Sequence, residues 1–364
     1  MIGGRLFILL LAAAAGSCGA QPNAAETGGA LADSSRSEPL TADPIKRTFE
    51  EWLLACDNGR VCRAQPRDSA GSLMIRRDPG PGGLVRVVLD GQEPGEPLRP
   101  NPATIRLAGV PDAPAAPWRL DAEADRATLE GQPAIAFVRA LSRASALSYE
   151  TTEGRLEVPL AGMRAALAVM DAEQGHAGGE AAFVRVGAQP RAALPAAPAL
   201  PVVRVAAAAP LPALPDGFAA RVRRESREVF DDCEVEPPQE DQVYPLTAED
   251  VLMIAECSRG LTHVSYRLLT VPREDPARAQ LVLLPTIDEM DDAYEDGSAT
   301  YVDLEWDPAT RQLYSNYRSC MGACGDNVAW VFDGTQFQLL GYAFYQGGGA
   351  ESLDLYRADV RRPR

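Results

Sequence analysis

Few residues of this 364-residue chain belong to the types that usually carry out nucleophilic or acid–base chemistry. The chain has two histidines, His176 and His263, and Lys46 is its single lysine. General acid–base catalysis most often uses histidine, and Schiff-base chemistry requires lysine. Recognisable motifs of phosphate loops, dinucleotide sites, serine hydrolases and zinc proteases are also missing. The sequence therefore favours a non-catalytic protein, and it predicts no catalytic residue, no cofactor and no metal site.

The histidines and the lysine have simple structural interpretations. His176 lies in a glycine-rich stretch after a predicted helix, so we expect it to be exposed. His263 lies near Cys257 in the chain, and we expect a structural role for it. Lys46 falls at the end of a segment that we interpret as a linker, where no reactive site is expected.

Carboxylates form the main catalytic alternative. Asp303 and Glu305 alternate with Val302 and Leu304, so in a strand both side chains would lie on one face. Together, or with Asp326, they could serve a carboxylate-based hydrolase or transferase. A separate acidic run at 288–297 offers oxygen ligands for calcium but lacks the spacing of an EF-hand. We interpret that run as a solvated loop.

The cysteines indicate an oxidising compartment. The chain has seven of them: Cys18, Cys56, Cys62, Cys233, Cys257, Cys320 and Cys324. Without Cys18 an even set remains, which in an exported protein is typical of disulfides. Proximity favours the pairs Cys56–Cys62, Cys233–Cys257 and Cys320–Cys324, although spacing alone does not settle the connectivity. A thiol-redox role for Cys320 and Cys324 is the second alternative function, but their spacing is not the Cys-x-x-Cys of thioredoxin-like proteins.

The N-terminus predicts export. Arg5 precedes an apolar run at 6–15 that is too short to span a bilayer as a helix. Residues 15–18, AGSC, then resemble a bacterial lipobox, in which the cysteine becomes the lipidated first residue of the mature chain. Residues 1–18 are therefore expected to be a signal peptide with a lipobox, and residues 19–46 a flexible tether. We predict a periplasmic protein anchored to the outer membrane through Cys18, or a secreted protein if Cys18 is not lipidated.

Charge restricts the partners of the protein. The formal net charge is −16, and residues 216–364 hold 28 acidic and 14 basic residues. Binding to nucleic acid depends on basic residues that neutralise phosphates, and docking on anionic lipid does so as well. We therefore expect no nucleic acid as a partner. No second apolar run is long enough to span a membrane, so we expect no transmembrane span in the mature chain. The lipid anchor and an envelope protein or glycan are the expected partners.

An Ala/Pro tract at 188–215 divides the chain. Its prolines lack backbone donors and fix φ, so the tract cannot form a regular helix and is expected to be an extended connector. Residues 202–206 within it could add a strand to a neighbouring sheet. We predict a mainly β (α+β) protein with an N-terminal β-rich domain with two helices at 47–187 and a C-terminal acidic antiparallel β meander at 216–364.

Turn residues and periodicity define the elements of both halves. The Asp57-Asn58-Gly59 turn is expected to join strands at 49–56 and 60–65. Helices are predicted from Pro133 and over 161–173, followed by a strand at 182–186. In the second half we expect a charged helix near 218–230, a continuous strand at 300–306 and a hairpin turn at Asp333-Gly334.

Aromatic residues in the second half suggest a binding face. The residues that we expect to bind a protein or glycan are Tyr317, Arg318, Trp330 and Tyr345. Aromatic side chains near an arginine are common in recognition surfaces. The alternative is that alternating aromatic residues pack a core. A non-catalytic binding or envelope-associated module is our leading functional hypothesis.

Three segments resemble a family of uncharacterised proteobacterial envelope proteins, domain of unknown function 1176. They are residues 49–62 (FEEWLLACDNGRVC), residues 160–175 with LAGMRAAL and MDAEQG, and residues 324–337 with CGD and WVFDGTQF. The chain departs from the family at 346–349, where a cysteine is usual, and at 257–263, which replaces a typical Cys-x-x-Gly-Ala-Tyr-Asn stretch. The N-terminal half also distantly resembles invasion-associated locus B proteins. The resemblance implies a β-rich fold and an envelope location, but no reaction.

Overall fold

The fold is dominated by antiparallel strands, which confirms the prediction of a mainly β, α+β protein. A computed structural model describes residues 43–363 except 68–71, 91, 94–95, 98, 112–115, 122–124, 208–209, 235–240, 289, 291–299, 320–323 and 347–351. The described residues fall in one compact unit. The predicted division into two domains at 188–215 stays a prediction.

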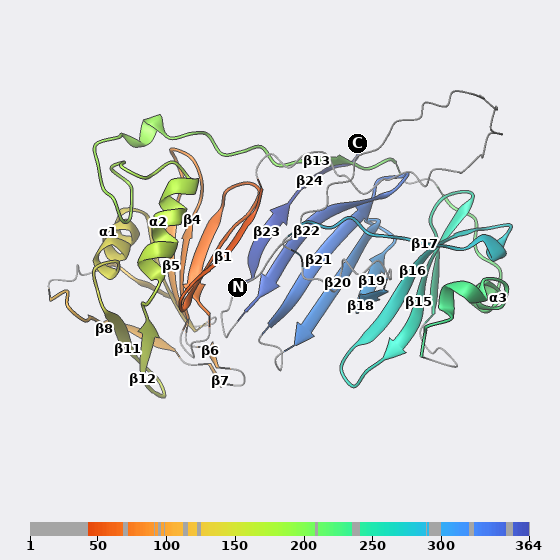
Figure 1. The fold of residues 1–364 in the computed structure, drawn as a ribbon, viewed down its shortest axis with the longest axis horizontal. Coiled ribbons are helices and arrows are strands. Elements are labelled where there is room, and N and C mark those ends of the chain that lie inside the picture. The colour runs from red at the N-terminus through yellow and green to blue at the C-terminus, as the bar shows by residue number, and fades with distance from the viewer. Residues whose placement is uncertain are drawn as a thin grey trace, which may run out of the picture. The chain divides into compact units, whose positions relative to one another are not determined.

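The N-terminal part is built on a seven-stranded antiparallel sheet (Figure 1). In spatial order its strands are β1 (Ile45–Phe49), β2 (Trp52–Cys56), β3 (Cys62–Pro66), β4 (Ser72–Arg77), β5 (Val85–Asp90), β10 (Arg126–Glu130) and β9 (Arg119–Asp121). The strand predicted at 49–56 begins later, at Trp52 of β2, because Glu50 takes a left-handed φ of 50° and reverses the chain after β1. The predicted turn at 57–59 does join β2 to β3.

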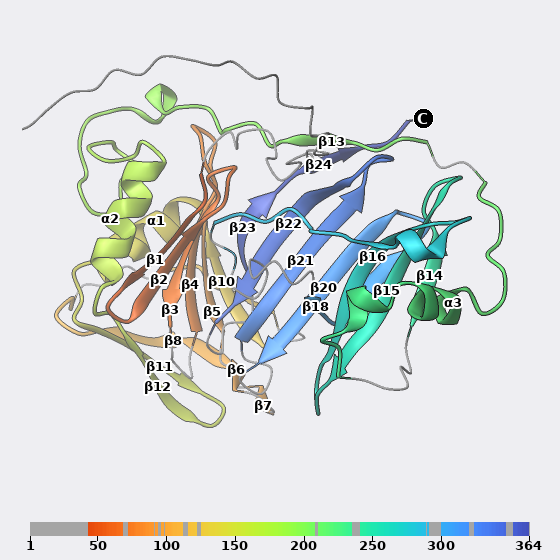
Figure 2. The same cartoon turned by 45° about the vertical axis from the view of Figure 1, so that its right-hand side comes forward.

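Two helices cover one face of this sheet, α1 (Gly131–Leu141) and α2 (Met163–Glu173) (Figures 1 and 2). Both helices were expected from the sequence. Their apolar side chains, such as Val138 and Leu167, join the buried face of the sheet in one core. Strands β8 (Pro100–Leu107), β11 (Ala146–Thr151) and β12 (Gly154–Pro159) form a small second sheet, and β6 (Gln92–Glu93) pairs with β7 (Glu96–Pro97).

The prediction of a strand at 182–186 is wrong, because these residues form a loop. The backbone N–H groups of Phe183 and Val184 donate to the carboxylate of Asp171 on α2 at 2.9–3.1 Å. The carboxylate thus takes the donors that a neighbouring strand would otherwise have accepted. The segment is consequently a loop bound to a helix.

The C-terminal part forms two further antiparallel sheets. The first contains β14 (Gln242–Pro245), β15 (Asp250–Arg259), β16 (Val264–Pro272) and β17 (Gln280–Leu281), with β18 (Thr300–Val302) also on β16. The second runs in chain order through β19 (Leu304–Asp307), β20 (Gln312–Ser319), β21 (Cys324–Phe332), β22 (Phe337–Tyr345) and β23 (Leu353–Arg357). This second sheet is a meander, as predicted. The continuous strand expected at 300–306 is interrupted by Asp303, whose φ is 48°.

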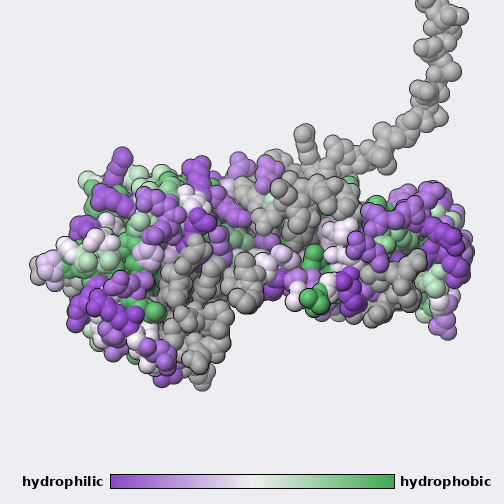
Figure 3. All heavy atoms as spheres, turned by 60° about the horizontal axis from the view of Figure 1, so that its bottom comes forward, coloured by the Kyte–Doolittle hydropathy of each residue, from purple (hydrophilic) through white to green (hydrophobic). Residues whose placement is uncertain are grey.

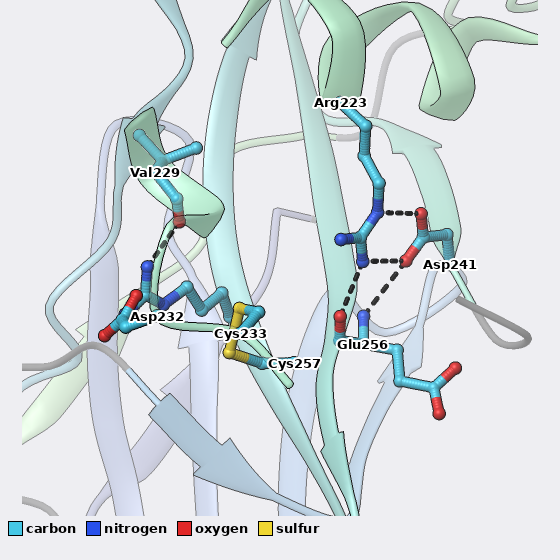
Figure 4. The surroundings of a disulfide bond; sticks show 8 residues. Arg223, Val229, Asp232, Cys233, Asp241, Glu256 and Cys257 are labelled. Carbon is cyan, nitrogen blue, oxygen red and sulfur yellow. Dashed lines mark hydrogen bonds and ion pairs between the residues drawn. A yellow bond between two sulfur atoms is a disulfide. The ribbon is translucent and has the colours of Figure 1, made fainter. Parts of the chain in front are cut away.

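A short helix, α3 (Phe218–Glu225), is fastened to the first of these sheets (Figure 4). The predicted helix at 218–230 ends earlier, at Glu225, and a 3-10 turn, η2 (Arg227–Phe230), follows it. Arg223 of α3 donates to both carboxylate oxygens of Asp241, at 2.6 and 2.7 Å, and to the carbonyl oxygen of Glu256 at 2.5 Å. The Cys233–Cys257 disulfide ties the segment after η2 to β15.

The connector contributes a strand, as the sequence suggested. β13 (Val202–Arg204) pairs in parallel with β24 (Asp359–Arg361), and both figures of the ribbon show the two side by side (Figures 1 and 2). Val203, Val205 and Val360 pack on Val331 and Leu340 of β21 and β22. The connector therefore covers part of the outer face of the C-terminal meander.

The other face of the N-terminal sheet packs on the C-terminal part. Leu53 and Ala55 point away from the helices and belong to the same core as Leu355 of β23. Lys46 lies in β1 and not in a linker, and its ammonium group is 4.4 Å from the ring centre of Phe344.

The surface in Figure 3 carries mostly hydrophilic side chains with scattered apolar ones. Within the described residues, no helix has the length and apolar character needed to cross a membrane.

Candidate functional site

The outer face of the meander carries a hydrogen-bonded group of three half-buried side chains, Arg318, Asn327 and Tyr345. They come from β20, β21 and β22 and lie side by side because Arg318 pairs with Gly325, and Gly325 pairs with Tyr345. Asn327 accepts from Arg318 Nη1 at 3.0 Å and donates through Nδ2 to the Tyr345 hydroxyl at 2.6 Å. The Arg318 guanidinium lies 4.1 Å from the ring centre of Tyr345. We call these three residues the outer-face triad.

The triad offers recognition chemistry. No carboxylate among the described residues forms an ion pair with Arg318, although the C-terminal half is strongly acidic. A guanidinium and an amide fixed beside an aromatic ring suit an acidic or hydroxylated ligand. The sequence prediction included Arg318 and Tyr345 but missed Asn327. The alternation of β21, in which Asp326, Val328 and Trp330 are buried, could have identified it.

The other two predicted binding residues lie elsewhere. Trp330 is fully buried in the core, and its indole Nε1 donates to the carbonyl oxygen of Pro285 at 2.8 Å. It is therefore a core residue and not part of a surface. Tyr317 points to the face opposite Arg318, because neighbours along a strand alternate. Its ring centre is 5.0 Å from that of His263.

His263 forms a second polar group with Asp303. Nδ1 of His263 lies 2.6 Å from Oδ2 of Asp303, and Oδ1 of Asp303 accepts from the backbone N–H of Val264 at 3.1 Å. The left-handed backbone of Asp303 brings its side chain back toward the β15–β16 hairpin. The structure therefore gives His263 a carboxylate partner that its sequence neighbourhood did not indicate.

The three carboxylates considered for catalysis have separate environments. Asp303 is hydrogen-bonded to His263, whereas Glu305 is exposed on β19. Asp326 is buried and accepts from the hydroxyl of Tyr342 at 2.8 Å. Within the described part of the chain, no group of three or more His, Cys, Asp or Glu side chains could hold a metal ion. The acidic run at 288–297 lies almost entirely outside the described residues.

The Cys-Asp-Asn turn of the first resembling segment is a structural joint. Asp57 is fully buried, and its Oδ1 accepts the N–H groups of Gly59 and Val61 at 2.9 and 2.8 Å. Its Oδ2 accepts from Arg357 Nε at 2.5 Å. Asn58 pairs with the backbone of Arg357, donating to its carbonyl oxygen and accepting from its N–H, each at 2.9 Å. Burial nevertheless raises the pKa of Asp57, and this effect exceeds the lowering by the hydrogen bond and charge of Arg357 and by the Val61 N–H.

The polar residues of the second resembling segment, Asp171 and Gln174, also have a structural role, because they bind Arg77 of β4. Arg77 is 1% exposed and donates to Asp171 at 2.9 Å and to Gln174 at 2.5 Å, and it lies 4.2 Å from the ring centre of Phe183. Burial lowers the pKa of Arg77 to about 10, against the opposing effect of Asp171. The amide of Gln174 donates to the carbonyl oxygens of Arg60 and Arg77. These polar residues hold α2 on the sheet.

His176 is 1% exposed, so the expectation of an exposed histidine is wrong. It follows the end of α2, and burial lowers its pKa to about 4, with further lowering by the charges of Arg77 and Arg191.

In the third segment, Asp333 closes the predicted hairpin turn by accepting from the N–H groups of Thr335 and Gln336 at 2.7 and 3.0 Å.

Two of the three predicted disulfides are formed, Cys56–Cys62 and Cys233–Cys257. Cys324 is also disulfide-bonded. Cys320 and Cys18 lie outside the described residues, so the Cys320–Cys324 pair and the lipidation of Cys18 stay predictions.

Comparisons with known proteins agree with the resemblance of the three segments. A family model described as a protein of unknown function, DUF1176, matches residues 46–346. The uncharacterised protein YpfG of Escherichia coli strain K12 is 26% identical over 327 residues, which are 83% of this chain and 88% of that protein. No solved structure matches. The more distant resemblance to invasion-associated locus B proteins stays a prediction.

Proposed function

This chain belongs to the DUF1176 family, and we propose that it is a non-catalytic binding protein of the cell envelope. Its binding surface is the outer-face triad, and its ligand is an acidic glycan of the envelope. In this proposal Cys18 carries the lipid that anchors the protein to the outer membrane, with the folded part facing the periplasm. An envelope protein as the ligand is the alternative within the same function.

The outer-face triad is the observation that carries the proposal. Arg318, Asn327 and Tyr345 are half-buried, and they are held by one another. A ligand therefore meets groups whose conformational entropy is already reduced, which favours affinity. By contrast, Asp57, Asn58 and Asp171 of the resembling segments are buried and bonded within the protein. The polar residues of those segments support the scaffold and leave recognition to the triad.

Sedimentation with purified peptidoglycan sacculi tests the proposal. The full chain should sediment with sacculi, and Arg318→Ala or Tyr345→Ala should reduce the bound fraction at least fivefold. Arg224→Ala is the matched control for Arg318→Ala, because it removes an equal charge from an exposed position on α3 in the same half. Equal sedimentation of all variants, or none by the unsubstituted chain, would contradict a glycan-binding triad.

The anchor needs a separate measurement. The intact mass of protein extracted from membranes, taken without reduction and after thiol alkylation, should show a diacyl or triacyl adduct on Cys18. A mass that begins beyond Cys18 would mean a secreted protein. Two alkylated thiols at Cys320 and Cys324 would favour the thiol-redox alternative, whose next test is the reduction potential of that pair.

One observation keeps a hydrolase or transferase as the second candidate function. The hydrogen bond between His263 and Asp303 provides a histidine oriented by a carboxylate, which is an arrangement that acid–base catalysis uses. A hydrolytic activity that is lost in His263→Asn and retained in Arg318→Ala would favour this candidate over the binding function.

A further inference from the structure

A second site lies where the connector meets the C-terminal meander, away from the outer-face triad. It is a pocket of about 460 Å³ between the connector, the segment around Leu246 and the turn that joins β19 to β20. Its walls include Leu211, Leu246, Trp306 and Pro308. Its volume and apolar lining are those of a small-molecule site.

The lining has one charged side chain, Arg311, and no carboxylate. This is unusual in a half of the chain with twice as many acidic as basic residues. Among the described residues, Arg311 donates only to the carbonyl oxygen of Leu246, at 3.4 Å, and packs 4.8 Å from the ring centre of Phe332. The carboxylate of Asp333 is near enough to raise the pKa of Arg311, but among the described residues no carboxylate forms an ion pair with its guanidinium. A guanidinium in an apolar wall that lacks a direct ion pair favours a ligand that carries a negative charge.

The backbone of Arg311 supports a role for its side chain. Its φ is 56°, a left-handed value that an asparagine or glycine adopts with less strain. The turn at this position would therefore form more readily with a different residue. Strained positions of this kind are frequent at binding sites.

Trp306 supplies a second unsatisfied group. Its side chain is nine-tenths buried, and within the described part of the chain its indole Nε1 has no acceptor. The indoles of the two fully buried tryptophans, Trp52 and Trp330, each donate to a carbonyl oxygen at 2.8 Å. A buried donor without an acceptor is unfavourable. Trp306 also lines the pocket, where its ring offers apolar surface to a ligand.

We propose that this pocket binds a small apolar carboxylate. The carboxylate pairs with Arg311, and the hydrocarbon part packs on Trp306, Leu246 and the connector. This proposal is independent of the outer-face triad, because the two sites share no residue.

The test compares three ligands of equal length in titration calorimetry with the full chain: octanoate, octan-1-ol and octylamine. Octanoate should saturate one site, and the two ligands without a carboxylate should bind at least tenfold more weakly. Arg311→Asn should abolish the preference for octanoate, and asparagine also relieves the left-handed backbone, so the variant should fold. Trp306→Phe should keep the aromatic wall and weaken octanoate binding. Arg318→Ala is the control and should bind octanoate as the unsubstituted chain does.

Several results would overturn the proposal: the absence of saturable binding, equal affinity for octanoate and octan-1-ol, or an unchanged preference in Arg311→Asn. The ligand comparison uses the unsubstituted chain and does not depend on any variant. Loss of octanoate binding in Arg318→Ala would also contradict it, because the ligand would then belong to the outer-face triad.

Discussion

The carboxylate of Asp57 and the guanidinium of Arg357 are 2.5 Å apart in space and 300 residues apart in the chain. The carboxylate is fully buried, while the arginine side chain is 39% exposed. Asn58 adds two hydrogen bonds to the backbone of the same arginine. A turn near the start of the described chain is thus joined to β23, near its end.

Asp57→Ala should lower the free energy of unfolding by about 3 kcal/mol, because it leaves two buried N–H groups without an acceptor and removes the partner of Arg357. Asp57→Asn retains an oxygen for Gly59 and Val61, and it should cost about 1 kcal/mol. Denaturant unfolding measures both values. An equal loss in the two variants would show that the turn does not depend on the Oδ1 acceptor.

Gly162 and Gly109 form a matched pair for testing the approach of α2 to the sheet. Their φ values are 86° and 83°, so alanine is similarly strained at both positions. A Cβ at Gly162 would lie 1.8 Å from the carbonyl oxygen of Phe49, whereas a Cβ at Gly109 would meet nothing within 4 Å. Gly109→Ala should cost about 1 kcal/mol.

Gly162→Ala should cost at least about 3 kcal/mol, since the backbone of β1 or α2 must move as well. Thermal unfolding of the two variants checks the difference. Equal melting temperatures would contradict the close contact between Gly162 and Phe49.

Asp171 is expected to be among the most sensitive positions. Asp171→Ala leaves the Arg77 guanidinium charged and buried without its partner, which should cost about 3–5 kcal/mol. Replacing both residues, as Arg77→Met with Asp171→Ala, removes that unpaired charge. The double variant should therefore be more stable than Asp171→Ala alone, and additive losses in a double-mutant cycle would contradict the ion pair.

His176 predicts a dependence of stability on pH. The folded protein holds its pKa near 4, while in the unfolded chain the pKa is 6.5, so the unfolded chain takes up a proton first as the pH falls. Stability should thus be complete above pH 6.5 and decline by up to about 3 kcal/mol toward pH 4.

His176→Leu lacks this group and should lose less stability over the same range. Denaturant midpoints at pH 7.5 and 4.5 for both proteins provide the comparison. Parallel losses in the two proteins would assign the acid sensitivity to other groups.

Local features of the sequence were reliable guides to the hairpins and helices. The turns at 57–59 and 333–334 depend on side chains that bond to their own backbone, so their signals lie within a few residues. The apolar periodicity of α1 and α2 is also local. These signals, with three segments that resemble one family, were sufficient for the fold class.

Several of the errors involve partners outside the local segment. Residues 182–186 are not a strand, because a carboxylate on α2 takes their donors. His176 is buried by a neighbourhood that includes Arg77 and Arg191, although its own stretch is rich in glycine. Alternation along β21 separates two faces of the strand but does not show which face is buried. It therefore did not show that Trp330 lies in the core. The partnership of His263 with Asp303 depends on a left-handed residue that propensity does not predict.

The parallel pairing of β13 with β24 has a consequence for the order of folding. Asp57 and Asn58, in the turn between β2 and β3, bond to Arg357, and the connector strand pairs with 359–361. The N-terminal sheet therefore completes its contacts only after nearly the whole described chain is available. Contacts of such high sequence separation slow folding and prolong the exposure of unpaired strand edges. Chains that lack β23 and β24 should accordingly depend on chaperones, even though their helices and first hairpins can form.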